Sequence, residues 1–397
     1  MTTGVWRRVS RIRNYDTLFL TAGIWFLAKF LRYAFPALFP VFRSEFAVSN
    51  AFLGTAFTAM MVGYSLMQFP SGVLSDRFGA VQVIVAGAVV AASGALVLGI
   101  TAPLAVLLGG MLLVGLGTGV HKTVSIRLLS RVYPSKTGRA LGVFDTLGAF
   151  GGVAAPTAVV LVTNAGNWHA LFLAGAVSGL ALAGGVLAYV PRRTPTHEDD
   201  DSEHALALER YLTLFQSRRF RLFVGVTLCF GFAYNGVVAF LPLYLTEQGL
   251  TETTASVVYG SLFAVSFVQV VTGDLSDRFG QLPLAIAVLT VAAGALGALF
   301  VVGEATVFVL GAIVVAFGLG SHGFRPIRGA YLSATIPGEV AGGGLGLVRT
   351  LLMGVGAIAP AIVGIVADIA GFSVAFGLLA VVMAGAVLLA CATALAR

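Results

Sequence analysis

Charged and titratable side chains interrupt the long apolar stretches of this sequence, where such side chains are rare. Each charge costs about 3 kcal/mol at the centre of a membrane span, so six cations facing lipid would oppose insertion by roughly 15 kcal/mol or more. These side chains must instead face water, a protein partner or an anion, and the N–H groups of arginine fit carboxylate, phosphate or nitrate. The residues are Lys29, Arg32, His121, Lys122, Asp145, His322, Arg325, Arg328 and Arg349.

The positions of these residues predict an ion pair and a binding site for an anion. Lys122 and Asp145 fall on neighbouring antiparallel spans, both within about 10 Å of the membrane midplane at a rise of about 1.5 Å per residue. We expect them to form an ion pair, which would serve either the structure or proton coupling. His121 is a second candidate for proton transfer, because histidine titrates near neutrality. Six cations with one acid favour an anionic ligand, although Arg328 could instead reach the membrane surface.

The composition is typical of a membrane protein. Of the 397 residues, 58% are hydrophobic and 10% are charged, whereas soluble domains average about 25% charged residues. The apolar residues form blocks of about 20, the length that crosses a hydrocarbon core. We therefore predict an all-α polytopic membrane protein with twelve transmembrane helices. The spans cover residues 16–40, 50–72, 80–100, 103–130, 138–162, 168–190, 220–245, 253–274, 281–302, 305–332, 340–366 and 371–395.

The loops predict an orientation and a division into domains. Lysine and arginine gather on the side of the N-terminus, from Arg7 to Arg13 and again from Arg131 to Arg139. The opposite side carries Arg43, Glu45, Glu247, Glu252, Glu304 and Asp368. Positively charged loops stay in the cytoplasm, so we expect both termini to be cytoplasmic and the first span to be retained rather than cleaved. The acidic loop 191–219 indicates a solvated linker between bundles at 1–190 and 220–397.

An internal repeat with an offset of about 200 residues supports this division. The octapeptide Gly72-Val-Leu-Ser-Asp-Arg-Phe-Gly79 recurs as Gly273-Asp-Leu-Ser-Asp-Arg-Phe-Gly280, and Gly117 recurs as Gly320. A parallel repeat predicts two pseudo-symmetric six-helix bundles, with a substrate site between them near the midplane. The repeat also sets Arg325 opposite Lys122, Arg349 opposite Asp145 and Tyr234 opposite Arg32.

The two octapeptides resemble the signature loop of the major facilitator superfamily, which joins spans 2 and 3 and again spans 8 and 9. The segments Arg139-Ala-Leu-Gly142 and Trp168-His169 also resemble family sequence, so the resemblance covers nearly the whole chain. It implies the fold of that family and a cytoplasmic gate that breaks when the protein opens inward. The gate residues would be Gly72, Asp76, Arg77, Gly79, Arg139, Gly273, Asp277, Arg278 and Gly280.

Within this gate we expect Arg139 to pair with Asp277, while the repeat counterpart of Arg139 is Gly342, which leaves Asp76 without an equivalent cation. Asp76 would then rely on a helix dipole alone, and Arg127 would be an ordinary interfacial cation. The glycines that open the two octapeptides would allow tight packing at a helix end. One departure disfavours drug efflux: Met111 stands where drug-proton antiporters of the superfamily carry an arginine.

These observations together predict a secondary transporter that moves a small organic or inorganic anion by alternating access, coupled to protons. The predicted substrate-binding residues are Lys29, Arg32, Tyr64, Lys122, Tyr234, Asn235, Arg325 and Arg349, with Asp145 and His121 for proton coupling. An efflux antiporter for drugs or metabolites, or a sensor that binds without transport, are the alternatives. We expect a monomer in the plasma membrane, with no cofactor, metal or nucleic acid. The motifs that enzymes use are missing from the sequence, so we do not expect catalysis.

Overall fold

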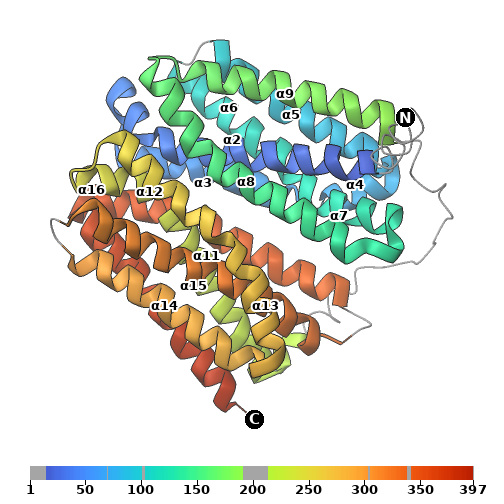
Figure 1. Cartoon of the computed structure of the whole chain (residues 1–397), viewed down its shortest axis with the longest axis vertical. Helices are drawn as coiled ribbons and strands as arrows, with labels where there is room; N and C mark the ends of the chain where they lie inside the picture. Colours follow the sequence, from blue (N-terminus) through green and yellow to red (C-terminus); the bar gives the residue numbers. More distant parts are fainter. Residues whose placement is uncertain are drawn as a thin grey trace, which may run out of the picture. The chain divides into compact units, whose positions relative to one another are not determined.

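The computed structural model describes residues 15–68, 70–100, 103–190, 213–302, 305–337 and 341–396, with the backbone alone at 341–345. Across these residues the chain is helical and forms no strand (Figure 1). Ten helical segments among them are long and apolar enough to cross a membrane, or eleven when α3 and α4 count as one bent span. The prediction of an all-α polytopic membrane protein is confirmed.

The helices differ widely in length, and three short 3-10 turns join some of them. In chain order the helices are α2 (Asp16–Phe46), α3 (Asn50–Leu66), α4 (Pro70–Phe78), α5 (Ala80–Ile100), α6 (Leu104–Gly119), α7 (His121–Val132), α8 (Thr137–Asn164), α9 (His169–Tyr189), α11 (Arg218–Glu247), α12 (Glu252–Ala264), α13 (Val268–Phe279), α14 (Gln281–Val301), α15 (Val307–Thr335) and α16 (Ala341–Leu395). The 3-10 turns are η2 (Pro134–Lys136), η4 (Thr213–Gln216) and η5 (Val265–Phe267).

Several predicted spans are built from two helices, and one long helix contains two spans. The second predicted span is α3 with α4, which meet at a bend of 44°. The fourth is α6 with α7, and the eighth is α12 with α13. The helix α16 covers the last two predicted spans, because Gly371 within it has a φ of +83° and breaks the helical geometry. Glycine adopts this angle without steric cost. With these pairings and the break at Gly371, each of the twelve predicted spans has a helical counterpart.

Side-chain caps and glycines explain several helix ends. Ser217 caps α11 by accepting a hydrogen bond from the backbone N–H of Phe220 at 3.3 Å, and Thr251 does the same for α12. Serine and threonine are favoured at such positions because they satisfy a free backbone donor. At the other end of two helices, Gly79 after α4 and Gly280 after α13 have φ angles of +87° and +88°. The repeated octapeptide therefore ends in the same backbone turn both times.

The chain packs as two compact units. In unit 1, the described residues up to Ala34 pack with those between Gly63 and Val190. In unit 2, Phe35–Val62 packs with the described residues from Thr213 onward. The helix α2 thus begins in one unit and ends in the other. This division by packing differs from the repeat-based bundles 1–190 and 220–397 at residues 35–62, and the repeat-based division stays a prediction. Most of the predicted linker, residues 191–212, lies outside the described residues.

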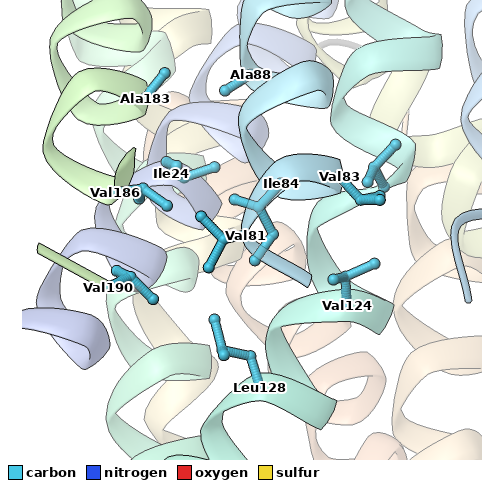
Figure 2. Packing of buried hydrophobic residues seen from close by; sticks show 11 residues of the cluster. Ile24, Val81, Val83, Ile84, Ala88, Val124, Leu128, Ala183, Val186 and Val190 are labelled. Carbon is cyan, nitrogen blue, oxygen red and sulfur yellow. The ribbon is translucent and has the colours of Figure 1, made fainter. Parts of the chain in front are cut away.

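The core of unit 1 joins α2, α5, α7 and α9. Figure 2 shows how Ile24 of α2 lies among the valines and isoleucine of α5 and α9, with Leu128 of α7 at one end of the cluster. The labelled side chains are Ile24, Val81, Val83, Ile84, Ala88, Val124, Leu128, Ala183, Val186 and Val190. Because α2 contributes to this cluster, its remaining faces are held at a defined rotation relative to α7.

Repeat-related glycines bring neighbouring helices close together in both units. A Cβ atom on Gly117 of α6 would lie 2.5 Å from the carbonyl oxygen of Gly87 in α5. A Cβ atom on Gly320 of α15, the repeat counterpart, would lie 2.5 Å from the carbonyl oxygen of Val288 in α14. Small residues at helix contacts allow such close approach in membrane proteins. The sequence repeat is therefore also a repeat of packing.

We expect Gly117→Ala to lower the apparent melting temperature of the purified protein in detergent, because the added methyl group forces α5 and α6 apart. Overpacking of this kind costs about 1–3 kcal/mol. The matched control is Gly109→Ala on the same helix, where a Cβ meets no atom within 4 Å. That change should be neutral or slightly stabilising, since alanine is the better helix former. Equal melting temperatures for the two variants would refute the close contact.

Candidate functional site

Three cations of unit 1 surround one tryptophan, Trp25 of α2. Lys29 and Arg32 follow Trp25 by four and seven residues, which places all three on one face of the helix. The Lys29 ammonium lies 5.2 Å from the centroid of the Trp25 ring and the Arg32 guanidinium 5.6 Å from it. Lys122 of α7 brings a third cation to 5.5 Å. Cations within about 6 Å of a ring centroid are attracted by its electrons, so Trp25 offsets part of their mutual repulsion.

The Trp25 ring itself is held by its neighbours on α8. The ring of Phe144 lies parallel to it, with centroids 5.9 Å apart, and Trp25 is only 2% exposed. Gly148, one turn further along α8, leaves the space for the indole, because a Cβ atom there would overlap it. We name Trp25, Lys29, Arg32, Tyr64 and Lys122 the unit 1 cation site.

Arg32 is the most deeply placed cation of this site, with 5% of its surface exposed. Its Nε donates a hydrogen bond to the carbonyl oxygen of Ala28 at 3.1 Å, and its guanidinium lies 3.9 Å from the centroid of the Tyr64 ring. Among the described residues no carboxylate forms an ion pair with Arg32. With Nε engaged and one guanidinium face covered, the two terminal amino groups remain as donors for a planar oxyanion.

The predicted ion pair between Lys122 and Asp145 is confirmed, with Nζ and Oδ1 3.0 Å apart. The Lys122 side chain is 22% exposed and that of Asp145 is 53% exposed, so protein atoms leave about half of the Asp145 side chain uncovered. Pairs with this much exposure contribute about 0–1 kcal/mol to stability. The pair is therefore easily broken, as a group that exchanges protons would require.

His121 is more deeply buried than Lys122, the residue that follows it. It is 1% exposed and lines a small internal cavity with Leu31, Ala88 and Gly179. Its Nδ1 has no hydrogen-bond partner within the described part of the chain, and no hydrogen bond joins it to Asp145 there. The structure brings Lys122 and Asp145 together, whereas His121, the second residue predicted to carry protons, lies in an apolar interior.

In unit 2 the cations lie beside aromatic rings of α11. The guanidinium of Arg325 on α15 is 4.7 Å from the centroid of the Tyr234 ring. Arg328, one turn later on α15, is 5.9 Å from the ring of Phe230, one turn earlier on α11. The Phe230 and Tyr234 rings stack with centroids 5.8 Å apart. A pair of aromatic residues on one helix thus faces a pair of arginines on the next.

Arg349 of α16 is a third, partly buried arginine of unit 2 that was predicted to bind the anion with Arg325. We name Phe230, Tyr234, Arg325, Arg328 and Arg349 the unit 2 cation site. In the part of the chain that the structure describes, none of its arginines forms an ion pair. Like charges repel strongly away from bulk water, so this site favours a negatively charged ligand.

Asn235 was predicted to line the same site, and its amide is already engaged. Its Nδ2 donates to the carbonyl oxygen of Gly231 at 2.8 Å, next to Gly356 of α16, where a Cβ atom would lie 2.5 Å from that nitrogen. That hydrogen bond uses one of the two N–H groups of Nδ2, so the other N–H remains as a donor beside the acceptor oxygen. The binding role of Asn235 stays a prediction.

The sequence analysis missed Trp25 and Phe230. Both are aromatic residues in apolar spans, where aromatic side chains usually serve as core. The spacing from Trp25 to Lys29 and Arg32 was a usable signal, since residues four and seven apart share a helix face. The corresponding signal for Phe230 was its spacing of four residues from Tyr234.

The first signature loop requires two corrections. Asp76 forms an ion pair with Arg127 at 2.8 Å, so the expectation that Asp76 relies on a helix dipole alone is wrong, and Arg127 supplies its cation. The prediction of tight packing at Gly72 and Gly273 is also wrong. A Cβ atom on either glycine would lie 3.9 Å from its nearest neighbour, which is an ordinary van der Waals distance. The cation was missed because it comes from α7, outside the repeated octapeptide.

The second signature loop uses a local pair instead. Arg278 contacts Asp274 at 2.9 Å, one turn earlier on α13, where unit 1 has Val73. In the first loop, Arg77 lies 5.2 Å from the ring of Phe78. Arg139 belongs to unit 1 and Asp277 to unit 2, and their pairing stays a prediction.

Unit 2 also contains a cluster that ties α3 to α16, which we name the latch. The carboxylate of Asp368 accepts hydrogen bonds from the backbone N–H groups of Asn50, at 3.0 Å, and Ala51, at 2.7 Å. A carboxylate at the first turn of a helix also interacts favourably with the helix dipole. Arg43 at the end of α2 pairs with Glu247 at the end of α11. Two of the acids predicted on one side of the membrane, Glu247 and Asp368, therefore hold helix ends together.

Comparisons with known proteins agree with the fold described above. A family model described as Major Facilitator Superfamily matches residues 19–321. Two solved structures share the fold at low identity: a bacterial homolog of the human lysosomal transporter Spinster, with a TM-score of 0.77, 14% identity and 96% of each chain covered, and the nucleoside transporter NupG, with a TM-score of 0.80 and 12% identity over 96% of this chain and 99% of the other.

Two curated relatives are similar in sequence over part of their length. One is named a probable sulfoacetate transporter, SauU, from Cupriavidus necator, and is 26% identical over 64% of this chain and 63% of its own length. Another is named a probable nitrate transporter, NarT, from Staphylococcus aureus strain USA300. That protein is 31% identical over 27% of this chain and 28% of its own length. The chain thus matches less than two thirds of each relative.

We expect Asp368→Ala to loosen the latch, because both hydrogen bonds to the start of α3 are lost. Nitroxide labels at positions 55 and 369, in a variant with Cys229 and Cys391 replaced by serine, would report the separation of α3 and α16 by pulsed electron resonance. The longer-distance population should rise severalfold, and Asp368→Asn, which keeps one oxygen acceptor, should give an intermediate result. The control Asp274→Ala should leave the distances unchanged. Identical distributions in all variants would contradict the latch.

Proposed function

Because the chain belongs to the Major Facilitator Superfamily, we propose that it is a secondary transporter that moves a small organic or inorganic anion by alternating access. The observation that carries the proposal is Arg32, a buried guanidinium with no described carboxylate partner and two amino groups free to donate. An unpaired buried charge is costly. An anionic substrate that binds there removes this cost while it is bound.

The aromatic neighbours of the cations support the same substrate class. Tyr64 covers one face of the Arg32 guanidinium, and Tyr234 lies beside Arg325 in unit 2. A ring stabilises the cation without neutralising it, so its charge stays available. A carboxylate in the same place would compete with the substrate. Both units thus stabilise their cations in a way that leaves them able to bind an oxyanion.

The names of the relatives also point to oxyanions, since sulfoacetate and nitrate carry negatively charged planar or tetrahedral oxygen groups. We assign binding to Lys29, Arg32, Tyr64 and Lys122 in unit 1, and to Tyr234, Arg325 and Arg349 in unit 2. The distribution of lysine and arginine in the loops supports a plasma-membrane protein with both termini in the cytoplasm.

Proton coupling follows from the pair between Lys122 and Asp145. When Asp145 takes up a proton, the pair breaks and the Lys122 ammonium becomes available to an anion. Proton binding and anion binding then favour each other, and this coupling is reciprocal. About half of the Asp145 side chain is uncovered by protein, whereas His121 is buried and forms no hydrogen bond to it in the described part of the chain. We therefore assign proton coupling to Asp145 alone.

Replacement of Arg32 by glutamine should reduce uptake of the anion by reconstituted vesicles about tenfold to hundredfold, because a hydrogen bond to a charged group contributes about 1.5–3 kcal/mol. The substrate is first identified by screening a panel of carboxylates, sulfonates and nitrate. Arg32→Lys should also lose activity, since lysine lacks the planar pair of donors. The control is Arg131→Gln, which removes an exposed cation of α7. An equal loss in the control, or binding without any flux in the unaltered protein, would argue against this transporter.

A second variant, Asp145→Asn, tests the coupling. It should abolish accumulation driven by a pH gradient while counterflow exchange of the anion continues, because asparagine cannot release a proton. The measurement is uptake of labelled anion into vesicles with and without the gradient, with Glu252→Gln as the control carboxylate. Loss of both activities, or of neither, would contradict the assignment.

A further inference from the structure

A second group of cations lies at the end of unit 1 where α2 begins, apart from the unit 1 cation site. There a cavity of about 180 Å³ opens between the start of α2 and the start of α8. Its walls include Tyr15, Leu18, Phe19, Tyr133, Lys136 and Arg139. None of the proposed substrate ligands lines it, so the cavity requires its own explanation.

Two helix faces build this cavity. Tyr15 directly precedes α2, and Leu18 and Phe19 of α2 follow it by three and four residues. This spacing places the three side chains on one side of the helix. On the other wall, Lys136 and Arg139 are three residues apart and share the lining with the apolar Ala140 and Val143. The Tyr15 and Tyr133 rings, which also line the cavity, stack with centroids 5.9 Å apart. The lining therefore combines two cations with apolar and aromatic side chains.

The turn before α8 sets the position of the cations. Tyr133 ends α7, and its carbonyl oxygen accepts hydrogen bonds from the backbone N–H of Lys136 at 3.0 Å and from the hydroxyl of Thr137 at 2.9 Å. Lys136 and Arg139 are both exposed. The carboxylate of Asp16, close by in sequence, accepts a hydrogen bond from the backbone of Thr17 at 2.8 Å and does not line the cavity. The charge at this edge is therefore positive.

From this arrangement we propose that the cavity binds the phosphate head group of an anionic phospholipid, with Lys136 and Arg139 as phosphate ligands. Arginine and lysine at a membrane surface attract anionic lipids, and tyrosine is enriched at the level of the head groups. Phe19, which is 54% exposed, and Val143 contact the upper part of the acyl chains. A soluble phosphate would use the cations and leave this apolar wall uncovered.

The charges of the chain itself favour a lipid over the segment that precedes Tyr15. That segment carries Arg7, Arg8, Arg11 and Arg13, which Lys136 and Arg139 would repel. Anionic lipids are concentrated in the cytoplasmic leaflet, the side on which the distribution of lysine and arginine sets this end of unit 1. The inference does not depend on the identity of the transported anion.

Native mass spectrometry of the purified full-length protein in detergent tests this proposal. Phosphatidylglycerol should bind at one site at least tenfold more tightly than phosphatidylcholine, and glycerol 3-phosphate at millimolar concentration should not displace it. The double variant Lys136→Gln with Arg139→Gln should lose this preference. Arg131→Gln removes a nearby exposed cation that does not line the cavity, and it should keep the preference.

A second variant separates lipid binding from folding. Val143→Trp fills the cavity and keeps both cations, so it should also reduce phosphatidylglycerol binding while the melting temperature without added lipid stays within a few degrees. Equal binding of the two lipids by the unaltered protein would overturn the proposal. So would full displacement by glycerol 3-phosphate, or retention of the lipid preference in both the double variant and Val143→Trp.

Discussion

The cost of placing positive charge inside an apolar helix bundle governs most of what this structure does. A carboxylate beside each cation would remove that cost, but it would also remove the ability to bind an anion. The chain uses aromatic rings instead: Trp25 and Tyr64 in unit 1, Phe230 and Tyr234 in unit 2. A ring lowers the energy of the cation by about 0.5–2 kcal/mol and leaves its charge in place, which is the property that an anion carrier needs.

The two units meet this requirement differently, although their sequences repeat. Unit 1 contains an acid, Asp145, which neutralises Lys122, whereas the repeat position of Asp145 in unit 2 is Arg349. One site therefore has a charge that protonation can change, and the other has a charge that stays constant. In the proposed function, the response to pH belongs to unit 1 and the constant attraction for the anion belongs to unit 2.

The features that could be predicted from the sequence are those that depend on position along one helix. Depth along the spans paired Lys122 with Asp145, and the repeat identified the helices that carry the cations. What could not be predicted depends on contacts between helices. Arg127 reaches Asp76 across α7 and α4, and a span-by-span account cannot show this. The change of unit within α2 after Ala34 is invisible for the same reason, because the helix itself is continuous.

That change of unit falls just after Arg32, the buried cation of the unit 1 cation site. Arg32 lies on the last turn of α2 that packs in unit 1, and Pro36 follows one turn later within unit 2. Proline has no N–H, so the carbonyl oxygen of Arg32 loses its usual helical partner at that point. The helix therefore bends more easily beside the buried guanidinium than it would with a backbone N–H at position 36. Pro40 removes another backbone hydrogen bond one turn later, so the residue proposed to bind the anion lies at the start of a weakened stretch of its own helix.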